Sequence, residues 1–355
     1  MKGRKSLRFH GLSYHLPLVV SLLVVLLVGL LGAAFAPLVL QRTVTSMMIA
    51  VVLAVGLYIF SGNSGILSFG HMSFMAVGAY VTSWLTIPAN LKALFFSFPG
   101  PLDFLYTLNV PPWAGLLAGV FIAAVVGLVT GSILMRLSDI EASIATLSLL
   151  LIVNVVASNW QGVTQGQRTM VGVPQVVEIG NSMVCAILAI LIAYLYQRSR
   201  SGQRLRASRE DENAAAVLGV RVSLERLVAF TISAGVVGAG GVLYAHFSSG
   251  FSPNHFFLQR TFLIVAMVIV GGRHSLPGVV TGVFVITIVA EVLRKVEEGV
   301  VLFGVSINAP TGMGDVALGL FLLAVLVWRP EGIIGPAEIR WPSRNKGAAR
   351  EVETN

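Results

Sequence analysis

The chain has 355 residues, of which 55% are hydrophobic and 11% are charged, and its mean hydropathy is +0.84. Because a water-soluble domain carries about a quarter charged residues, this composition excludes a soluble enzyme and a soluble nucleic-acid-binding module. The net charge of +8 is then best explained by membrane topology, in which basic residues gather on the cytoplasmic side.

Ten apolar runs are long enough, or nearly so, to cross a bilayer as a helix, which takes roughly 20 residues. In chain order they are 16–36, 43–60, 66–86, 112–134, 142–158, 182–196, 227–247, 260–272, 278–293 and 313–328. The fifth, sixth, eighth and ninth runs are short, which predicts tilted or broken helices. The first run resembles a signal peptide, but it is longer than the roughly 7–15 apolar residues of a cleavable signal, and we interpret it as a retained span.

Lys and Arg residues are distributed unequally between the two sides of this arrangement. With a cytoplasmic N-terminus, 18 of them lie inside and 6 lie outside. The bias predicts that both termini are cytoplasmic. We expect an all-α polytopic membrane protein with a basic N-terminus (1–15), a transmembrane domain (16–328) that contains a long cytoplasmic loop (197–226), and a cytoplasmic tail (329–355).

Motifs for bond-making chemistry are missing from the sequence. It contains no G-x-x-x-x-G-K-[ST] stretch, no H-E-x-x-H pair and no G-x-S-x-G elbow. The six histidines are scattered and the single Cys185 lies in an apolar run, so we expect no catalytic residue, metal or cofactor. Acidic residues nearly avoid the span centres, which disfavours a secondary transporter driven by protons or sodium.

The stretch from Ser61 to Trp84 is rich in glycine and serine. Candidate residues in it are Gly65, Ser68, Gly70, His71 and Gly78. Such residues either permit close helix packing or break a helix and free backbone groups to meet a polar ligand. Both alternatives, plain packing and a substrate pathway, stay open at this point.

The loop at 197–226 contains a predicted short helix. Asp211 or Ser208 is expected to cap its N-terminus, and Gly219 is expected to end it in a left-handed conformation. The residues that favour helix between them are Ala214, Ala215, Ala216 and Leu218. The result is a narrow apolar face, which fits a groove on another protein or the chain's own surface.

This loop resembles a known motif. Glu212-Asn213-Ala214-Ala215-Ala216 followed by Gly219 is similar to the "EAA" coupling motif of bacterial ABC importer permeases, from which Asn213 departs. Three further segments, 66–80, 145–174 and 270–278, resemble the branched-chain amino acid permeases of the LivM type in the same order. The chain departs from those permeases at 140–142, 165–166 and 273–274, which leaves the identity of the substrate open.

The resemblance implies a function and a set of partners. It implies a permease subunit of an ATP-driven ABC importer that translocates branched-chain or other hydrophobic amino acids across the bacterial inner membrane. The expected partners are a second homologous permease, two ATP-binding subunits that hydrolyse ATP, and a periplasmic substrate-binding protein, with no nucleic acid. Glu212, Ala214, Ala215, Ala216 and Gly219 would form the ATPase-coupling loop. Gly65, Ser68, Gly70, His71, Gly78 and Thr146 would belong to the substrate pathway.

Two kinds of alternative remain. The same type of permease imports urea, short amides or aromatic acids in related systems. A stand-alone channel or a secondary transporter is the rival from another class, although neither needs the charged, alanine-rich loop.

Overall fold

The computed structural model describes residues 6–98, 100–297, 300–302, 305–307, 310, 312–329 and 331–334. The two chain termini, which the charge distribution predicts to be cytoplasmic, lie outside the described residues.

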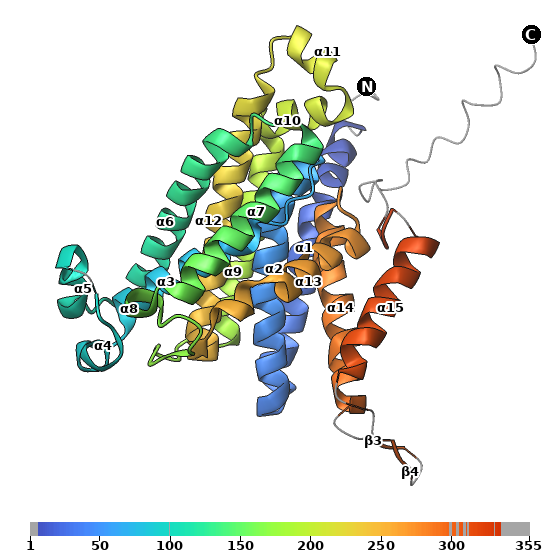
Figure 1. The fold of residues 1–355 in the computed structure, drawn as a ribbon. Helices are drawn as coiled ribbons and strands as arrows, with labels where there is room; N and C mark the ends of the chain where they lie inside the picture. Colours follow the sequence, from blue (N-terminus) through green and yellow to red (C-terminus); the bar gives the residue numbers. More distant parts are fainter. Residues whose placement is uncertain are drawn as a thin grey trace, which may run out of the picture.

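The described part of the chain is built almost entirely from helices (Figure 1). The α-helices are α1 (Ser6–Phe35), α2 (Leu38–Ser64), α3 (His71–Thr86), α4 (Ala89–Phe95), α5 (Phe104–Thr107), α6 (Pro112–Leu134), α7 (Asp139–Asn159), α8 (Gln161–Thr164), α9 (Ile179–Arg198), α10 (Arg200–Glu210), α11 (Glu212–Val217), α12 (Val222–Ser248), α13 (Leu258–Gly271), α14 (Leu276–Glu297) and α15 (Met313–Trp328). The 3-10 helices η1 (Gly100–Leu102) and η2 (Pro253–Phe256) are short. Strands β1 (Met170–Val171) and β2 (Gly250–Phe251) form one antiparallel pair, and β3 (Val300–Leu302) and β4 (Val305–Ile307) form another.

Eight segments of the described chain are long and apolar enough to cross a membrane: α1 from Leu16, α2, α6, α7, α9, α12, η2 with α13, and α14. Helices α3 and α15 have 16 residues each. At 1.5 Å per residue such a helix is about 24 Å long, less than the roughly 30 Å of the hydrocarbon core. The predicted all-α polytopic class is confirmed, and the ten expected runs become eight full-length crossings and two shorter helices.

Helices α2 and α12 lie at the centre of the bundle. The most apolar window of α2 is 89% buried and that of α12 is 72% buried, against 22% for α1, α6 and α7. Small residues let the central helices approach closely, since a Cβ on Gly78 of α3 would overlap the carbonyl oxygen of Gly238 of α12. The peripheral helices carry the exposed apolar side chains that a lipid environment requires.

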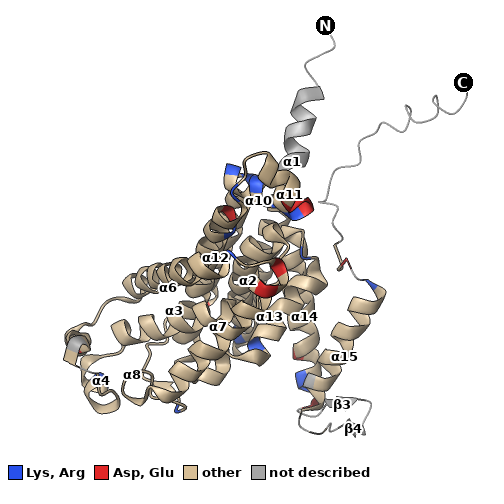
Figure 2. Ribbon diagram, turned by 45° about the horizontal axis from the view of Figure 1, so that its top comes forward, with Lys and Arg blue, Asp and Glu red and all other residues tan. Residues whose placement is uncertain are grey.

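The two ends of the bundle differ in character. Helices α10 and α11 cap one end, and α4, α5 and the β3–β4 hairpin lie towards the other (Figure 1). The segment after α15 returns to the α10–α11 side, where Ile333 donates its N–H to the carbonyl oxygen of Val270 near the end of α13 (2.8 Å). Several Lys, Arg, Asp and Glu residues lie in and around α10 and α11 (Figure 2).

Candidate functional site

A break separates α2 from α3 inside the bundle. Helix α2 ends at Ser64, and Gly65 follows with a φ of +81°, in the left-handed region. Two serine hydroxyls accept hydrogen bonds from the freed backbone, Ser64 Oγ from Ile66 N–H (3.2 Å) and Ser61 Oγ from Ser68 N–H (3.4 Å). Non-helical backbone at membrane depth is tolerated where protein groups satisfy it, which these hydroxyls do. The sequence predicted a span over 66–86; the helix instead begins at His71.

Five of the six predicted pathway residues meet at this break. Ser68 Oγ lies 2.7 Å from His71 Nδ1, and Thr146 Oγ1 accepts a hydrogen bond from Phe69 N–H (3.3 Å). A Cβ on Gly70 would overlap the carbonyl oxygen of Thr146, so the break lies directly against α7. Gly65, at the start of the break, is the fifth member of the group, whereas Gly78 lies two turns into α3 in a packing contact with α12.

His71 is fully enclosed. Its ring lies 5.6 Å from that of Phe60, 5.8 Å from Phe74 and 5.2 Å from Phe230, measured between ring centroids. Its Nε2 atom is buried and has no hydrogen-bond partner among the described residues. An unpaired buried nitrogen is uncommon in proteins, which singles out His71 within this aromatic cluster.

A small, mostly apolar cavity lies next to the break. It is lined by Ser73, Ala76, Leu150, Val153, Asn154, Ala157, Pro253 and Phe256, which come from α3, α7 and η2. The hydroxyl of Ser73 has no partner within the described chain, while Asn154 Nδ2 donates to the carbonyl oxygen of Pro253 (3.4 Å). With a volume of about 10 Å³ the cavity has room for about one water molecule, and an amino acid would need the surrounding helices to move apart.

Helix α11 has the caps that the sequence predicts. Asp211 Oδ1 accepts from Ala214 N–H (2.9 Å), so Asp211 is the N-cap, whereas Ser208 Oγ donates to the carbonyl oxygen of Leu205 (2.8 Å). Gly219 has a φ of +83°, and Val220 N–H reaches the carbonyl oxygen of Ala215 (3.1 Å). This is the Schellman arrangement, and it confirms the predicted left-handed end.

The apolar face of α11 differs from the expected one. Ala215 is buried with 3% of its surface exposed, whereas Val217 and Leu218 are 88% and 84% exposed. Ala214 and Ala216 are exposed beside them. The three alanines therefore do not form one docking face, and the large apolar groups that protrude are Val217 and Leu218. A helix of six residues is too short for its buried side to be read from periodicity.

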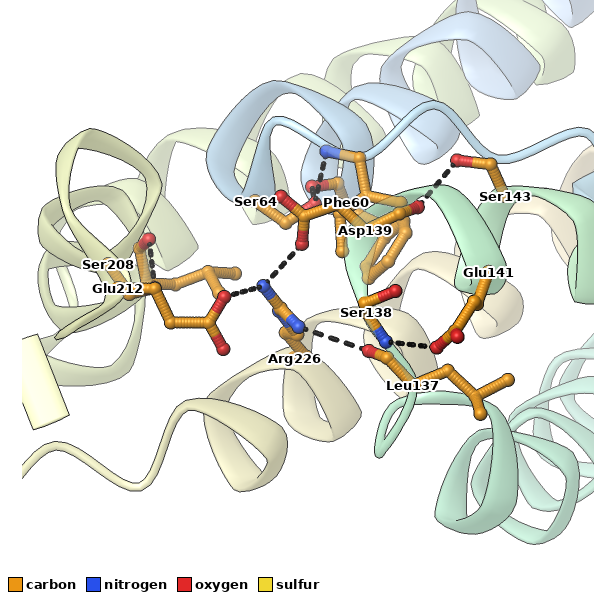
Figure 3. Close-up of polar contacts among 12 residues, drawn as sticks. Phe60, Ser64, Leu137, Ser138, Asp139, Glu141, Ser143, Ser208, Glu212 and Arg226 are labelled. Carbon is orange, nitrogen blue, oxygen red and sulfur yellow. Dashed lines mark hydrogen bonds and ion pairs between the residues drawn. The ribbon is translucent and has the colours of Figure 1, made fainter.

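Two arginines anchor the α10–α11 pair to the bundle. Arg209 of α10 donates from Nη1 to the carbonyl oxygen of Gly62 (2.9 Å) and lies equally close to Nδ1 of His274. Arg226, in the second turn of α12, is buried and forms ion pairs with Asp139 and Glu212 (Figure 3). Sequence reasoning counted both arginines only as topology charges, because burial of a single arginine leaves no periodic signal.

These features together define a class. The described chain is a multi-pass bundle with a hydrogen-bonded break between α2 and α3 and a capped helix pair at one end, next to the start of that break. No group of three or more His, Cys, Asp or Glu side chains in the described part could hold a metal ion. This is the architecture of a membrane permease. The chain belongs to the family described as branched-chain amino acid transport system / permease component, which matches residues 38–326. It is therefore a membrane-spanning permease component of ABC-type transport, located in the inner membrane, and the family is not a catalytic one.

Individual relatives are distant. The chain is 26% identical over 340 residues to the high-affinity branched-chain amino acid transport system permease protein LivM of Escherichia coli (strain K12), covering 86% of this chain and 72% of that protein. It is 28% identical over 229 residues to the autoinducer 2 import system permease protein LsrC of Salmonella paratyphi B, covering 63% of each chain. A probable branched-chain amino acid transport permease protein LivM of Methanocaldococcus jannaschii is 27% identical over 168 residues, 46% of this chain and 48% of that protein.

Proposed function

We propose that this chain is the permease subunit of an ATP-driven importer for branched-chain or other hydrophobic amino acids. The observation that carries the proposal is the similarity to LivM over 86% of the chain. The buried hydroxyl of Ser73 supports it, because this group lies just beyond the α2–α3 break and has no hydrogen-bond partner among the described residues.

The proposed complex contains a second homologous permease, two subunits that bind and hydrolyse ATP, and a periplasmic substrate-binding protein. The α10–α11 end is cytoplasmic in this proposal, and α11 is the segment that contacts an ATPase subunit. The exposed pair Val217–Leu218 supports this, because large apolar groups that protrude from a charged surface mark a protein contact.

A different small solute is the second candidate substrate. The match to LsrC, the permease protein of an autoinducer 2 import system, favours it, because a solute unrelated to amino acids is named for a relative of similar identity. Urea, short amides and aromatic acids belong to the same alternative.

Uptake by the reconstituted complex distinguishes these substrates. We expect ATP-dependent accumulation of radiolabelled leucine, isoleucine and valine when the binding protein is supplied, and none in the presence of a non-hydrolysable nucleotide. Ser73→Ala should lower uptake without changing ATPase assembly, whereas the nearby Ala76→Ser should have a smaller effect. Uptake of urea or autoinducer 2 with no uptake of leucine would show that the proposed substrate is wrong, while the proposed class of transporter would stand.

Docking of the ATPase subunits is tested separately on α11. Val217→Asp and Leu218→Asp place a charge where an apolar contact is proposed, and we expect both to abolish co-purification of the ATPase subunits. Asn213→Asp is the matched control, because it adds the same charge at an exposed residue of the same helix. This variant should still co-purify with the ATPase subunits.

A further inference from the structure

The guanidinium of Arg226 joins three separate segments of the chain (Figure 3). Its Nη2 atom lies 2.6 Å from Asp139 Oδ1, at the start of α7, and 3.0 Å from Glu212 Oε2, at the start of α11. Its Nη1 atom donates to the carbonyl oxygen of Leu137 (3.4 Å). Arg226 itself belongs to α12, so one side chain connects α11, α12 and the turn before α7.

The arginine is buried and its partners are not. The Arg226 side chain is 6% exposed, against 61% for Asp139 and 52% for Glu212. Removing a guanidinium from water is costly, so it depends on both carboxylates, whereas each carboxylate would be solvated without it. The contact therefore constrains where α7 and α11 lie relative to α12, and this is a positional effect beyond that of an ordinary surface ion pair.

Helix α7 extends from this contact to the α2–α3 break. Ser138 and Glu141 cap its first turn, with Ser138 N–H donating to Glu141 Oε2 (3.1 Å), which fixes Asp139 at the helix start. About two turns further on, Thr146 accepts the hydrogen bond from Phe69 N–H and faces Gly70. The buried share of α7 is only 22%, so this helix has fewer packing constraints than α2 or α12.

We propose that Arg226 is a positioning residue that ties α11 to the N-terminus of α7, so that displacement of α11 by an ATPase subunit moves α7 and, with it, the break at residues 65–70. The proposal rests on the proposed function, because it takes α11 to be the ATPase-contacting segment. It adds a specific route, from Glu212 through Arg226 and Asp139 to Thr146.

Variants of the two carboxylates test each half of the route in the full reconstituted complex. Asp139→Asn removes the charge that pairs Arg226 with α7, and Glu212→Gln removes the charge that pairs Arg226 with α11. We expect both complexes to assemble and hydrolyse ATP, but to transport at least about fivefold less substrate per ATP hydrolysed, the lower range of a typical coupling effect. Arg226→Lys keeps the charge but lacks the planar fork that reaches both carboxylates, and it should fall between these variants and the wild type.

The matched control is a neighbouring ion pair that does not reach α7. Arg204 of α10 pairs with Glu225 of α12 at 3.3 Å, and Arg204 is 57% exposed. Arg204→Gln should leave the ratio of transport to hydrolysis unchanged. Combining Asp139→Asn with Glu212→Gln should lower coupling little more than either single change, because both act through the same side chain, whereas two independent destabilising effects would add.

A distance measurement supplies a readout that does not depend on activity. Spin labels on Ile140→Cys in α7 and Leu195→Cys in α9, two exposed positions, report movement of the α7 start against a helix that packs on α2, in a Cys185→Ala background. We expect their separation to change on ATP binding in the otherwise wild-type complex and to stay constant with Asp139→Asn.

The outcomes separate this inference from the proposed function. Suppose that Asp139→Asn keeps the wild-type ratio of transport to ATP hydrolysis and the wild-type change in spin-label distance, while Val217→Asp prevents docking of the ATPase subunits. The route through α7 is then wrong, and the proposed function is unaffected. If Val217→Asp and Leu218→Asp leave the ATPase subunits bound, the docking site on α11 is wrong. If Asp139→Asn or Arg226→Lys releases the ATPase subunits, Arg226 supports docking and not transmission, and the inference is overturned.

Discussion

Two arginine side chains contact the imidazole ring of His274. Arg209 Nη1 lies 2.9 Å from its Nδ1, and Arg273 Nε lies 3.0 Å from its Nε2. A neutral imidazole accepts a hydrogen bond at only one of its nitrogens, and a protonated one accepts none. Only a neutral His274 can therefore accept a hydrogen bond from Arg209, which also donates to the carbonyl oxygen of Gly62.

Stability should consequently fall in mild acid. Burial, followed by the charges of Arg209 and Arg273, lowers the pKa of His274 from its usual 6.5. Below that pH the unfolded chain binds a proton that the folded protein does not, so the free energy of unfolding falls as the pH drops below 6.5. Thermal unfolding in detergent between pH 7.5 and 5 measures this. His274→Gln should have a flatter profile, and an unchanged profile would contradict the role of the ring.

Gly219 is constrained by its backbone and not by its surroundings. Its φ is +83°, yet a Cβ there would meet no atom within 4 Å. Gly219→Ala should therefore cost about 1–2 kcal/mol at the end of α11 and reduce ATP-driven uptake, while the spans remain folded. Gly219→Asn should be tolerated better, since Asn adopts this conformation more readily. Comparing Gly219→Asn with the nearly isosteric Gly219→Asp isolates the effect of charge on docking. Equal uptake by the Ala and Asn variants would show that the turn is not limiting.

Some residues could be predicted from the sequence and others could not. Asp211 and Gly219 were predictable because capping is a local matter of side-chain type and backbone angle. Arg226 was not, since its partners Asp139 and Glu212 are brought to it by the packing of three helices. The exposure of Val217 and Leu218 was not predicted, because the three alanines before them were interpreted as the apolar face of the helix.

At the scale of the element, α3 is held in place by close contact of helix backbones. Gly78 faces the backbone of Gly238, and Gly119 of α6 approaches the same turn of α3. Gly78→Ala should destabilise the protein by about 1–3 kcal/mol, the typical cost of overpacking. Gly319→Ala is the matched control, because Gly319 lies in a helix with nothing within 4 Å, and it should be neutral or slightly stabilising. A lower melting temperature for Gly78→Ala alone would support packing as the role of Gly78. Equal melting temperatures with lost uptake would support the pathway.

The break between α2 and α3 shows what composition leaves undecided. Gly and Ser between 61 and 78 were compatible with either packing or a broken helix. The structure contains both, with a break at 65–70 and close packing at Gly78. Whether a glycine lies in the break or in a packing contact depends on the helix beside it, α7 for Gly70 and α12 for Gly78. Both of these helices are far from residues 61–78 in the sequence.

At the scale of the whole molecule, the charge distribution and the fold divide the chain in the same way. Arg209 in α10, Arg221 just before α12 and Arg226, which pairs with Glu212 of α11, lie at or beside the α10–α11 end, and the sequence assigns all three to the inside. Lys92 of α4, from the outside set, lies on the loop side opposite to it. Which end faces the cytoplasm is a prediction of the positive-inside rule, and 18 against 6 basic residues place the α10–α11 end inside.

Thiol labelling in intact cells tests this orientation. Asn213→Cys on α11 and Asp103→Cys before α5 are exposed positions at opposite ends, and Cys185→Ala removes the native thiol. We avoid Gly202 as a labelling position because a Cβ there would overlap the carbonyl oxygen of Tyr196. A membrane-impermeant maleimide should label Asp103→Cys in intact cells, and should label Asn213→Cys only after the membrane is permeabilised. The reverse pattern would place α11 outside the cell, where no ATP-hydrolysing subunit can reach Val217 and Leu218, and the coupling role of α11 would be lost together with the orientation.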